Sequence, residues 1–158
     1  MPPPPLFDLA GIELDRVVLT REEVYARLPQ RHEFMQLDGV VHIDLEHARG
    51  IGVRHVRDDE WWVRGHVPGK PILPGVLLLE MAAQTSAVLN SIAHEFSEFL
   101  AFGGVEECKF RGAVYPPATI YMLCQELEFR PRRLRSRTQA LVDDRIVFEA
   151  VITGLRLE

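Results

Sequence analysis

The segment VLLLEMAAQ, residues 76–84, constrains this 158-residue chain more than any other stretch. As a helix it is apolar on nearly every face, and such a helix belongs inside a protein rather than on its surface. Its two strongly polar side chains, Glu80 and Gln84, are four residues apart and therefore lie on the same face. A carboxyl group is costly to bury, so Glu80 is a candidate functional residue.

The helix must be covered by the rest of the chain. We expect it to begin near Gly75 or Val76 and to run to about Phe96, with its second half, including Asn90, emerging into solvent. Alternating side chains predict extended segments at 41–46 and 119–130, and further extended segments are expected at 51–56, 61–65, 104–115, 136–142 and 146–157. An α+β fold satisfies this order: an antiparallel sheet of about six strands wraps around one long central helix, or a second subunit covers the remaining helix faces.

The length of the chain fits one domain with a substantial core. Residues 1–19 are expected to form an N-terminal arm with a mobile, proline-rich start, and residues 20–158 a single domain. That domain opens with a capping box, Thr20 to Glu23, which predicts a short helix that ends near Leu28.

Composition argues against several classes of function. A net charge of −5 gives no positive surface for nucleic acid. Two cysteines make no disulfide framework, and no Cys/His cluster suggests a metal site. The N-terminal residues lack a basic targeting region, and the longest apolar stretch, 72–83, is interrupted and too short to span a bilayer. We therefore expect a cytoplasmic protein with no membrane partner, metal or other cofactor.

The loop GHVPGKPILPG, residues 65–75, supplies the partner chemistry for Glu80. His66 is a base in the right range near neutral pH, and the prolines restrict the loop that carries it. The first turn of the helix has free N–H groups that would stabilise a carbonyl oxygen as it gains negative charge. Because a carboxyl group in apolar surroundings tends to hold its proton, Glu80 would act as the acid. Together these groups suit proton abstraction beside a carbonyl, with loss of a β substituent.

The sequence also resembles a known family. GHVPGKPILPGVLLLEMAAQ is similar to the GHFPGxPxMPGVLxxEAxAQ pattern of FabZ-type 3-hydroxyacyl-acyl-carrier-protein dehydratases, with the same spacing from His to Glu. LPQRHEFMQLDGV at 28–40 resembles the family's LPHRxPFLLVDxV segment, and the KFRGAVYPPA stretch within residues 102–120 resembles KFRxPVxPGD. The resemblance covers nearly all of residues 20–157.

This resemblance implies a hotdog fold and the reversible dehydration of a 3-hydroxyacyl thioester, carried by acyl carrier protein, to the trans-2-enoyl thioester. It implies that His66 takes the α proton, Glu80 protonates the departing hydroxyl, and Gln84 orients Glu80. The substrate would meet the helix start at Gly75 and Val76, where the Gly75 N–H would polarise the thioester carbonyl. It further implies a homodimer in which His66 of one subunit meets Glu80 of the other, in some members assembled as a trimer of dimers.

Details of the motif narrow this expectation. A Glu at position 80, where the isomerising FabA branch carries Asp, matches the non-isomerising branch. The chain departs from the pattern at Val67, Leu73, Gln30, Glu33 and in Pro117-Ala118. None of these changes removes a proposed catalytic group. They bear on the width of the acyl tunnel and leave open a specialised pathway rather than bulk fatty-acid synthesis.

Two alternatives remain open at this point: a hotdog thioesterase, and a non-catalytic module that binds acyl chains or their carrier. Five arginines within residues 130–137 are either a docking patch for an acidic carrier protein or a solvated hairpin tip. The adjacent tryptophans Trp61 and Trp62 are expected to point to opposite sides of an extended segment, one of them into the core.

Overall fold

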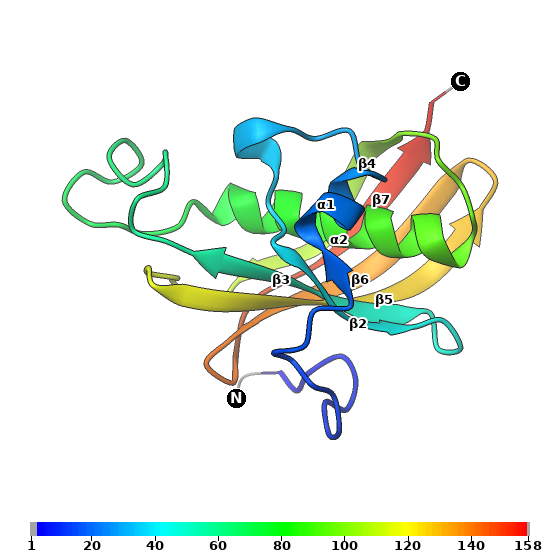
Figure 1. Ribbon diagram of the computed structural model, residues 1–158, viewed down its shortest axis with the longest axis horizontal. Coiled ribbons are helices and arrows are strands. Elements are labelled where there is room, and N and C mark those ends of the chain that lie inside the picture. The colour runs from blue at the N-terminus through cyan, green and yellow to red at the C-terminus, as the bar shows by residue number, and fades with distance from the viewer. Residues whose placement is uncertain (1–2, 158) are drawn as a thin grey trace.

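The computed structural model describes residues 3–157 and consists of a curved antiparallel sheet with one long helix against its inner face (Figure 1). The helices are α1 (Arg21–Tyr25), a 3₁₀ turn η1 (His32–Phe34) and α2 (Gly75–Ala93). The strands are β1 (Leu19–Thr20), β2 (Gly39–Asp44), β3 (Arg49–Val56), β4 (Leu100–Phe110), β5 (Ala118–Arg130), β6 (Arg133–Val142) and β7 (Arg145–Arg156).

The seven strands are joined in the order β1-β2-β3-β5-β6-β7-β4, and every pairing is antiparallel. The expected segments 136–142 and 146–157 correspond to β6 and β7, which a hairpin joins at Asp143 and Asp144, both in the left-handed region that a tight turn requires. The last strand in the order, β4, pairs with β7 alone and forms one edge of the sheet. The arrangement confirms the predicted hotdog fold.

The period of two along the strands sorts side chains onto two faces. On the inner face, residues such as Met122, Ala140 and Phe148 pack with Met81 and Val88 of α2. On the outer face lies a second apolar cluster, made of Val41, Ile51, Val53, Leu123, Leu141 and Ile146.

The N-terminal arm covers this outer cluster. Phe7 is buried against it, and Leu6, Leu9, Ile12 and Leu14 pack around it. Figure 1 shows the arm on the side of the sheet opposite α2. The carbonyl of Pro4 accepts a hydrogen bond of 3.2 Å from the Gln139 side chain, which connects the proline run to the sheet, and the mobility expected for this start stays a prediction. Residues 1 and 2 lie outside the described residues.

The structure corrects several expected boundaries. The capping box at Thr20 is present, but α1 ends at Tyr25 rather than near Leu28. Residues 61–65 form successive turns instead of a strand, because the N–H groups of Gly65 and His66 both bond back to the Trp62 carbonyl. With the two-residue β1 added, the sheet has seven strands rather than about six.

The central helix is also shorter and more deeply covered than expected. It ends at Ala93, where His94 caps it and Glu95 adopts a positive φ of 51°. Asn90, expected in solvent, is buried and bonds to the Ser86 carbonyl at 2.7 Å. By length and composition α2 would qualify as a membrane span, but 56% of its most apolar window is buried inside this structure, as in the core helix of a globular domain.

Candidate active site

Glu80 and Gln84 lie on one face of α2 and are joined by a hydrogen bond. The Gln84 amide nitrogen donates to Glu80 Oε1 at 2.7 Å. Glu80 is half-buried and lines an open cavity of about 240 Å³, whose other walls include Phe34, Ala83, Leu134 and Ile152. The mostly apolar lining of this cavity suits an acyl chain.

Gln84 is fully buried and uses both ends of its amide. The Tyr25 hydroxyl and the Gln36 backbone N–H lie 2.6 Å and 3.1 Å from its Oε1, while its Nε2 also donates to the Phe34 carbonyl at 2.6 Å. The groups that hold Gln84 therefore come from α1 and from the segment that crosses α2 at residues 34–36.

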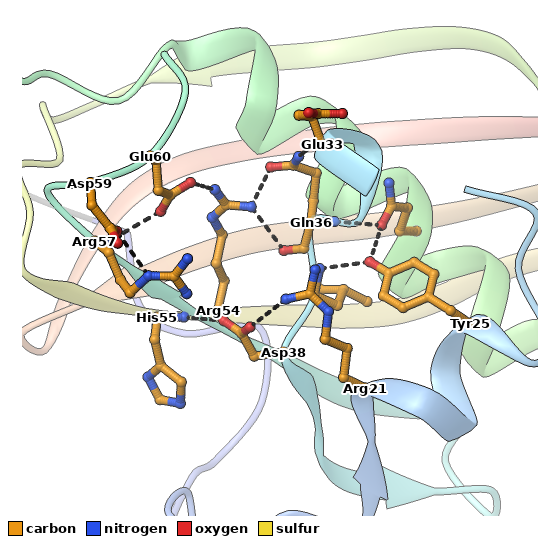
Figure 2. Close-up of polar contacts among 12 residues, drawn as sticks. Arg21, Tyr25, Glu33, Gln36, Asp38, Arg54, His55, Arg57, Asp59 and Glu60 are labelled. Atoms are coloured by element: carbon orange, nitrogen blue, oxygen red, sulfur yellow. Dashed lines mark hydrogen bonds and ion pairs between the residues drawn. The ribbon is translucent and has the colours of Figure 1, made fainter. Parts of the chain in front are cut away.

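A second polar layer fixes that crossing segment (Figure 2). The buried Arg54 on β3 lies between Gln36 and Glu60 and donates to the side chains of both. Gln36 in turn donates to the Glu33 carbonyl at 2.6 Å, and Glu60 also accepts from the Trp62 indole at 3.0 Å. Burial lowers the pKa of Arg54, and the carboxylate of Glu60 opposes that shift.

His66 lies in the exposed loop before α2. Its Nδ1 is 2.9 Å from the Ile72 carbonyl oxygen. Because a carbonyl only accepts, Nδ1 of the neutral ring carries the hydrogen, and the lone pair of Nε2 is left available as a base. The loop is anchored by Trp62, which is 2% exposed, whereas Trp61 is 55% exposed, so one of the two tryptophans is in the core as predicted.

The start of α2 has the free donors that the sequence predicted. Within residues 3–157, the N–H groups of Gly75 and Val76 donate to no acceptor, and the first backbone bond of the helix runs from Leu77 to Pro74. An aromatic carbon of Phe110 lies 3.0 Å from the point where a Cβ on Gly75 would be, so a glycine fits this close approach. The Val76 side chain is exposed.

A single chain does not bring the two predicted catalytic residues together. Among the described residues, the only hydrogen bond recorded for the His66 side chain is the one to Ile72, and His66 is not part of the cavity wall that contains Glu80. Within the same described range, no group of three or more His, Cys, Asp or Glu side chains is arranged to hold a metal ion.

Most arginines of the 130–137 cluster form ion pairs with acids of β4 and β5. Arg130 and Arg133 pair with Glu128 at 3.0 Å and 2.7 Å. Arg135 pairs with Glu106, and Arg137 pairs with Glu107 at 2.8 Å. The sequence run contains no acid, but the fold brings Glu128 of β5 and Glu106 and Glu107 of β4 next to it, which favours the solvated-surface interpretation of this cluster over a docking patch.

Comparison with known proteins fixes the family. The FabA-like domain matches residues 28–151. The chain is 37% identical over 146 residues to a 3-hydroxyacyl-[acyl-carrier-protein] dehydratase FabZ from Klebsiella pneumoniae, covering 90% of this chain and 95% of that protein. A FabZ from Acetivibrio thermocellus is 32% identical over 136 residues, covering 85% and 92% of the two chains. The chain belongs to the FabA-like family.

Its FabA-like fold also recurs among solved structures. A chain of the dehydratase heterocomplex ApeI:P from Xenorhabdus doucetiae matches with a TM-score of 0.72 at 13% identity, covering 85% of this chain and 91% of that one. The TT0310 protein from Thermus thermophilus matches with a TM-score of 0.60 at 17% identity, covering 81% and 100% of the two chains. At these identities the likeness concerns the fold alone.

Sequence reasoning within this FabA-like chain missed Tyr25 and Gln36. Tyr25 lies on the buried side of a short amphipathic helix, and nothing local indicates that its hydroxyl reaches α2, 59 residues away. Gln36 lies in the LPQRHEFMQLDGV segment that resembles the family pattern, but nothing in that segment singles out Gln36 or indicates its contact with Gln84.

Proposed function

We propose that this protein is a 3-hydroxyacyl-acyl-carrier-protein dehydratase, which removes water from a 3-hydroxyacyl thioester to give the trans-2-enoyl thioester without isomerisation, in acyl-chain synthesis in the cytoplasm. The names of its FabZ relatives support the reaction. The structural support is that each of the two side-chain groups is held ready: the Ile72 carbonyl directs the His66 imidazole, and the Gln84 amide holds the Glu80 carboxyl group.

The chemistry follows from the two side chains. His66 Nε2 takes the proton from the α carbon, and the thioester carbonyl oxygen gains negative charge. The free N–H of Gly75, with Val76 beside it at the start of α2, donates to that oxygen. Glu80 gives its proton to the β hydroxyl, which leaves as water while the C–C double bond forms. After water leaves, His66 carries an extra proton and Glu80 is ionised. Solvent transfers the proton from His66 to Glu80, and this step restores both groups without an oxidant or a metal.

The proposed active unit is a homodimer with sites built from two chains. His66 is exposed and makes no contact with Glu80 in one chain, and Glu80 faces an open cavity. The edge strand β4 has unpaired backbone groups on one side and exposes Phe102, Val105 and Phe110. Pairing of β4 with its copy across a twofold axis would extend the sheet and cover these residues. Assembly of three such dimers is a further part of the proposal, measured by the mass of the native particle.

The proposed carrier-protein contact lies around His66. Arg64 and Lys70 flank it in the same exposed loop, and neither has an ion pair among the described residues. Acyl carrier protein is acidic, so these two free cations are better placed to attract it than the matched arginines of β6.

The proposal is tested by incubating the protein with a 3-hydroxyacyl thioester of acyl carrier protein or of N-acetylcysteamine. A dehydratase forms the enoyl thioester, which is measured by its ultraviolet absorbance and by mass. Release of free thiol without enoyl product would instead identify a thioesterase. Binding of the thioester without either product would identify a non-catalytic module.

A further inference from the structure

The proton-donating half of the candidate site includes a tyrosine on a different helix. Tyr25 lies on α1 and is 4% exposed, and its hydroxyl oxygen is 2.6 Å from Gln84 Oε1. Gln84 in turn contacts Glu80. The chain of contacts thus runs from α1 to the carboxyl group proposed as the acid.

Two backbone groups fix which way the Gln84 amide faces. The Gln36 N–H can only donate, and it lies 3.1 Å from the oxygen end of the amide. The Phe34 carbonyl can only accept, and it lies 2.6 Å from the nitrogen end. An amide turned the other way would oppose donor to donor and acceptor to acceptor. The NH₂ group of Gln84 therefore faces Glu80.

The direction of the Tyr25 hydroxyl is fixed in the same way. The Leu37 backbone N–H donates to the hydroxyl oxygen at 2.8 Å, so the single hydroxyl hydrogen is left for Gln84 Oε1. Burial raises the pKa of Tyr25 to about 12, so this hydrogen is present at any pH at which an enzyme of this kind works.

The consequence falls on Glu80. Because Gln84 donates to Oε1, that oxygen is held as an acceptor, and the proton to be transferred is carried by Oε2. We propose that Tyr25 is a positioning residue of the dehydration reaction: through Gln84, it holds the Glu80 carboxyl group with Oε1 as acceptor and Oε2 as the proton-bearing atom. This inference rests on the proposed function.

The support behind Tyr25 is rigid. The Thr20–Glu23 capping box fixes the start of α1, and Arg21 on the same helix donates to Asp38 at 3.1 Å (Figure 2). An aromatic ring has few rotamers, so a hydroxyl placed this way loses little entropy when it orients its neighbour. The short helix α1 is thereby linked, through Tyr25 and Gln84, to the Glu80 carboxyl group on α2.

The test is Tyr25→Phe, which deletes one oxygen and keeps the ring. We expect kcat for a 3-hydroxyacyl thioester to fall roughly three- to tenfold, the range for one lost neutral hydrogen bond, with KM changed less than about twofold. The matched control is Tyr121→Phe, because Tyr121 packs with the outer-face cluster on the other side of the sheet. The control should keep the kcat of the natural protein.

A double-mutant cycle separates positioning from support of the fold. If Tyr25 acts through Gln84, adding Tyr25→Phe to Gln84→Met lowers kcat no further, although each change alone lowers it. A kcat for Tyr25→Phe equal to that of Tyr121→Phe overturns the inference, whether or not the melting temperature falls. The inference is also overturned if the double variant loses kcat by the product of the two single-variant factors. If Gln84→Met does not fold, the comparison of kcat between Tyr25→Phe and Tyr121→Phe can still overturn the inference.

Failure of the proposed function is distinguishable from failure of this inference. If the natural protein forms no enoyl thioester, the proposed function is wrong and the inference falls with it. If the natural protein is active and Tyr25→Phe matches it, only the inference is wrong.

Discussion

Glu80 and His66 are proposed to share one reaction, yet the structure treats them in opposite ways. Glu80 lies on the core helix and is held by Gln84. The Gln84 amide makes four hydrogen bonds, to α1, to two groups of the crossing segment and to Glu80, so its hydrogen-bonding capacity is filled. His66 lies in an exposed loop, and one hydrogen bond to Ile72 sets its ring. One half of the site is completed inside the chain, and the other half is presented outward.

The difference shows where each half is stabilised. Glu80, the proposed acid, is fixed by folding, because its supporting network is part of the hydrophobic core. His66, the proposed base, is carried by a proline-rich loop that loses little entropy on ordering, and in the proposed dimer it would gain a second set of contacts on assembly. Changes in the buried network that holds Glu80, such as those at Gln84, should therefore affect stability and rate together, whereas changes on the His66 side should affect rate and binding alone.

The largest expected effect is common to both halves. His66→Ala and Glu80→Gln should each lower kcat/KM by at least roughly 10³-fold, because each removes a group that transfers a proton. Circular dichroism and melting temperature should match the natural protein. Natural rates in either variant would show that the role given to that residue is wrong.

Mixing the two inactive variants sharpens the comparison further. In a heterodimer of His66→Ala with Glu80→Gln, one site lacks both groups and the other has both intact. Random reassortment after mild unfolding makes half of the dimers mixed, so about one quarter of the natural activity should return. No recovery, with mixed dimers verified by mass, would mean that each site is built within one chain.

Stability should separate the halves. Gln84→Met leaves the Tyr25 hydroxyl, the Gln36 N–H and the Phe34 carbonyl without their partner, and should lower the free energy of unfolding by about 3 kcal/mol. His66→Ala should change it by no more than about 0.5 kcal/mol. Urea denaturation of both variants measures this. Equal losses of unfolding free energy in Gln84→Met and His66→Ala would show that the Glu80 half of the site is no more tightly bound into the fold than the His66 half.

The smallest expected effect concerns the open half. Lys70→Glu should raise KM for a substrate carried by acyl carrier protein roughly threefold to tenfold at low salt, with little change for the N-acetylcysteamine thioester. Arg130→Glu introduces the same charge change at the hairpin tip, where Arg130 is already paired with Glu128, and serves as control. A larger effect of Arg130→Glu would return the docking role to the arginine cluster.

The sequence predicted the features that depend on local pattern. The all-apolar helix, the capping box at Thr20 and the strands after residue 100 follow from periodicity, and the structure contains each of them with shifted ends. The prediction for residues 61–65 was wrong because the backbone there bonds back to the Trp62 carbonyl, and the side-chain pattern of this short segment does not reveal that turn.

The features that could not be predicted are those created by the tertiary fold. The network around Gln84 joins residues 48 to 59 positions apart, and no local rule connects them. The arginine run appeared uncompensated because Glu106 and Glu107 come from a strand roughly thirty residues earlier in the chain. Asn90 was expected in solvent because a buried amide is recognised only once its partner, Ser86 on the preceding turn, is known to be enclosed.

The N-terminal arm changes what counts as the minimal folding unit. Phe7 and its apolar neighbours cover the hydrophobic cluster on the outer face of the sheet. In a chain that began at residue 20, this cluster would be exposed to water. Such a shortened protein would keep His66, Glu80 and the cavity beside Glu80, yet its exposed apolar surface would favour aggregation. A truncated protein made for expression should therefore keep Leu6 and all later residues, because Leu6 is the first residue that covers the outer-face cluster.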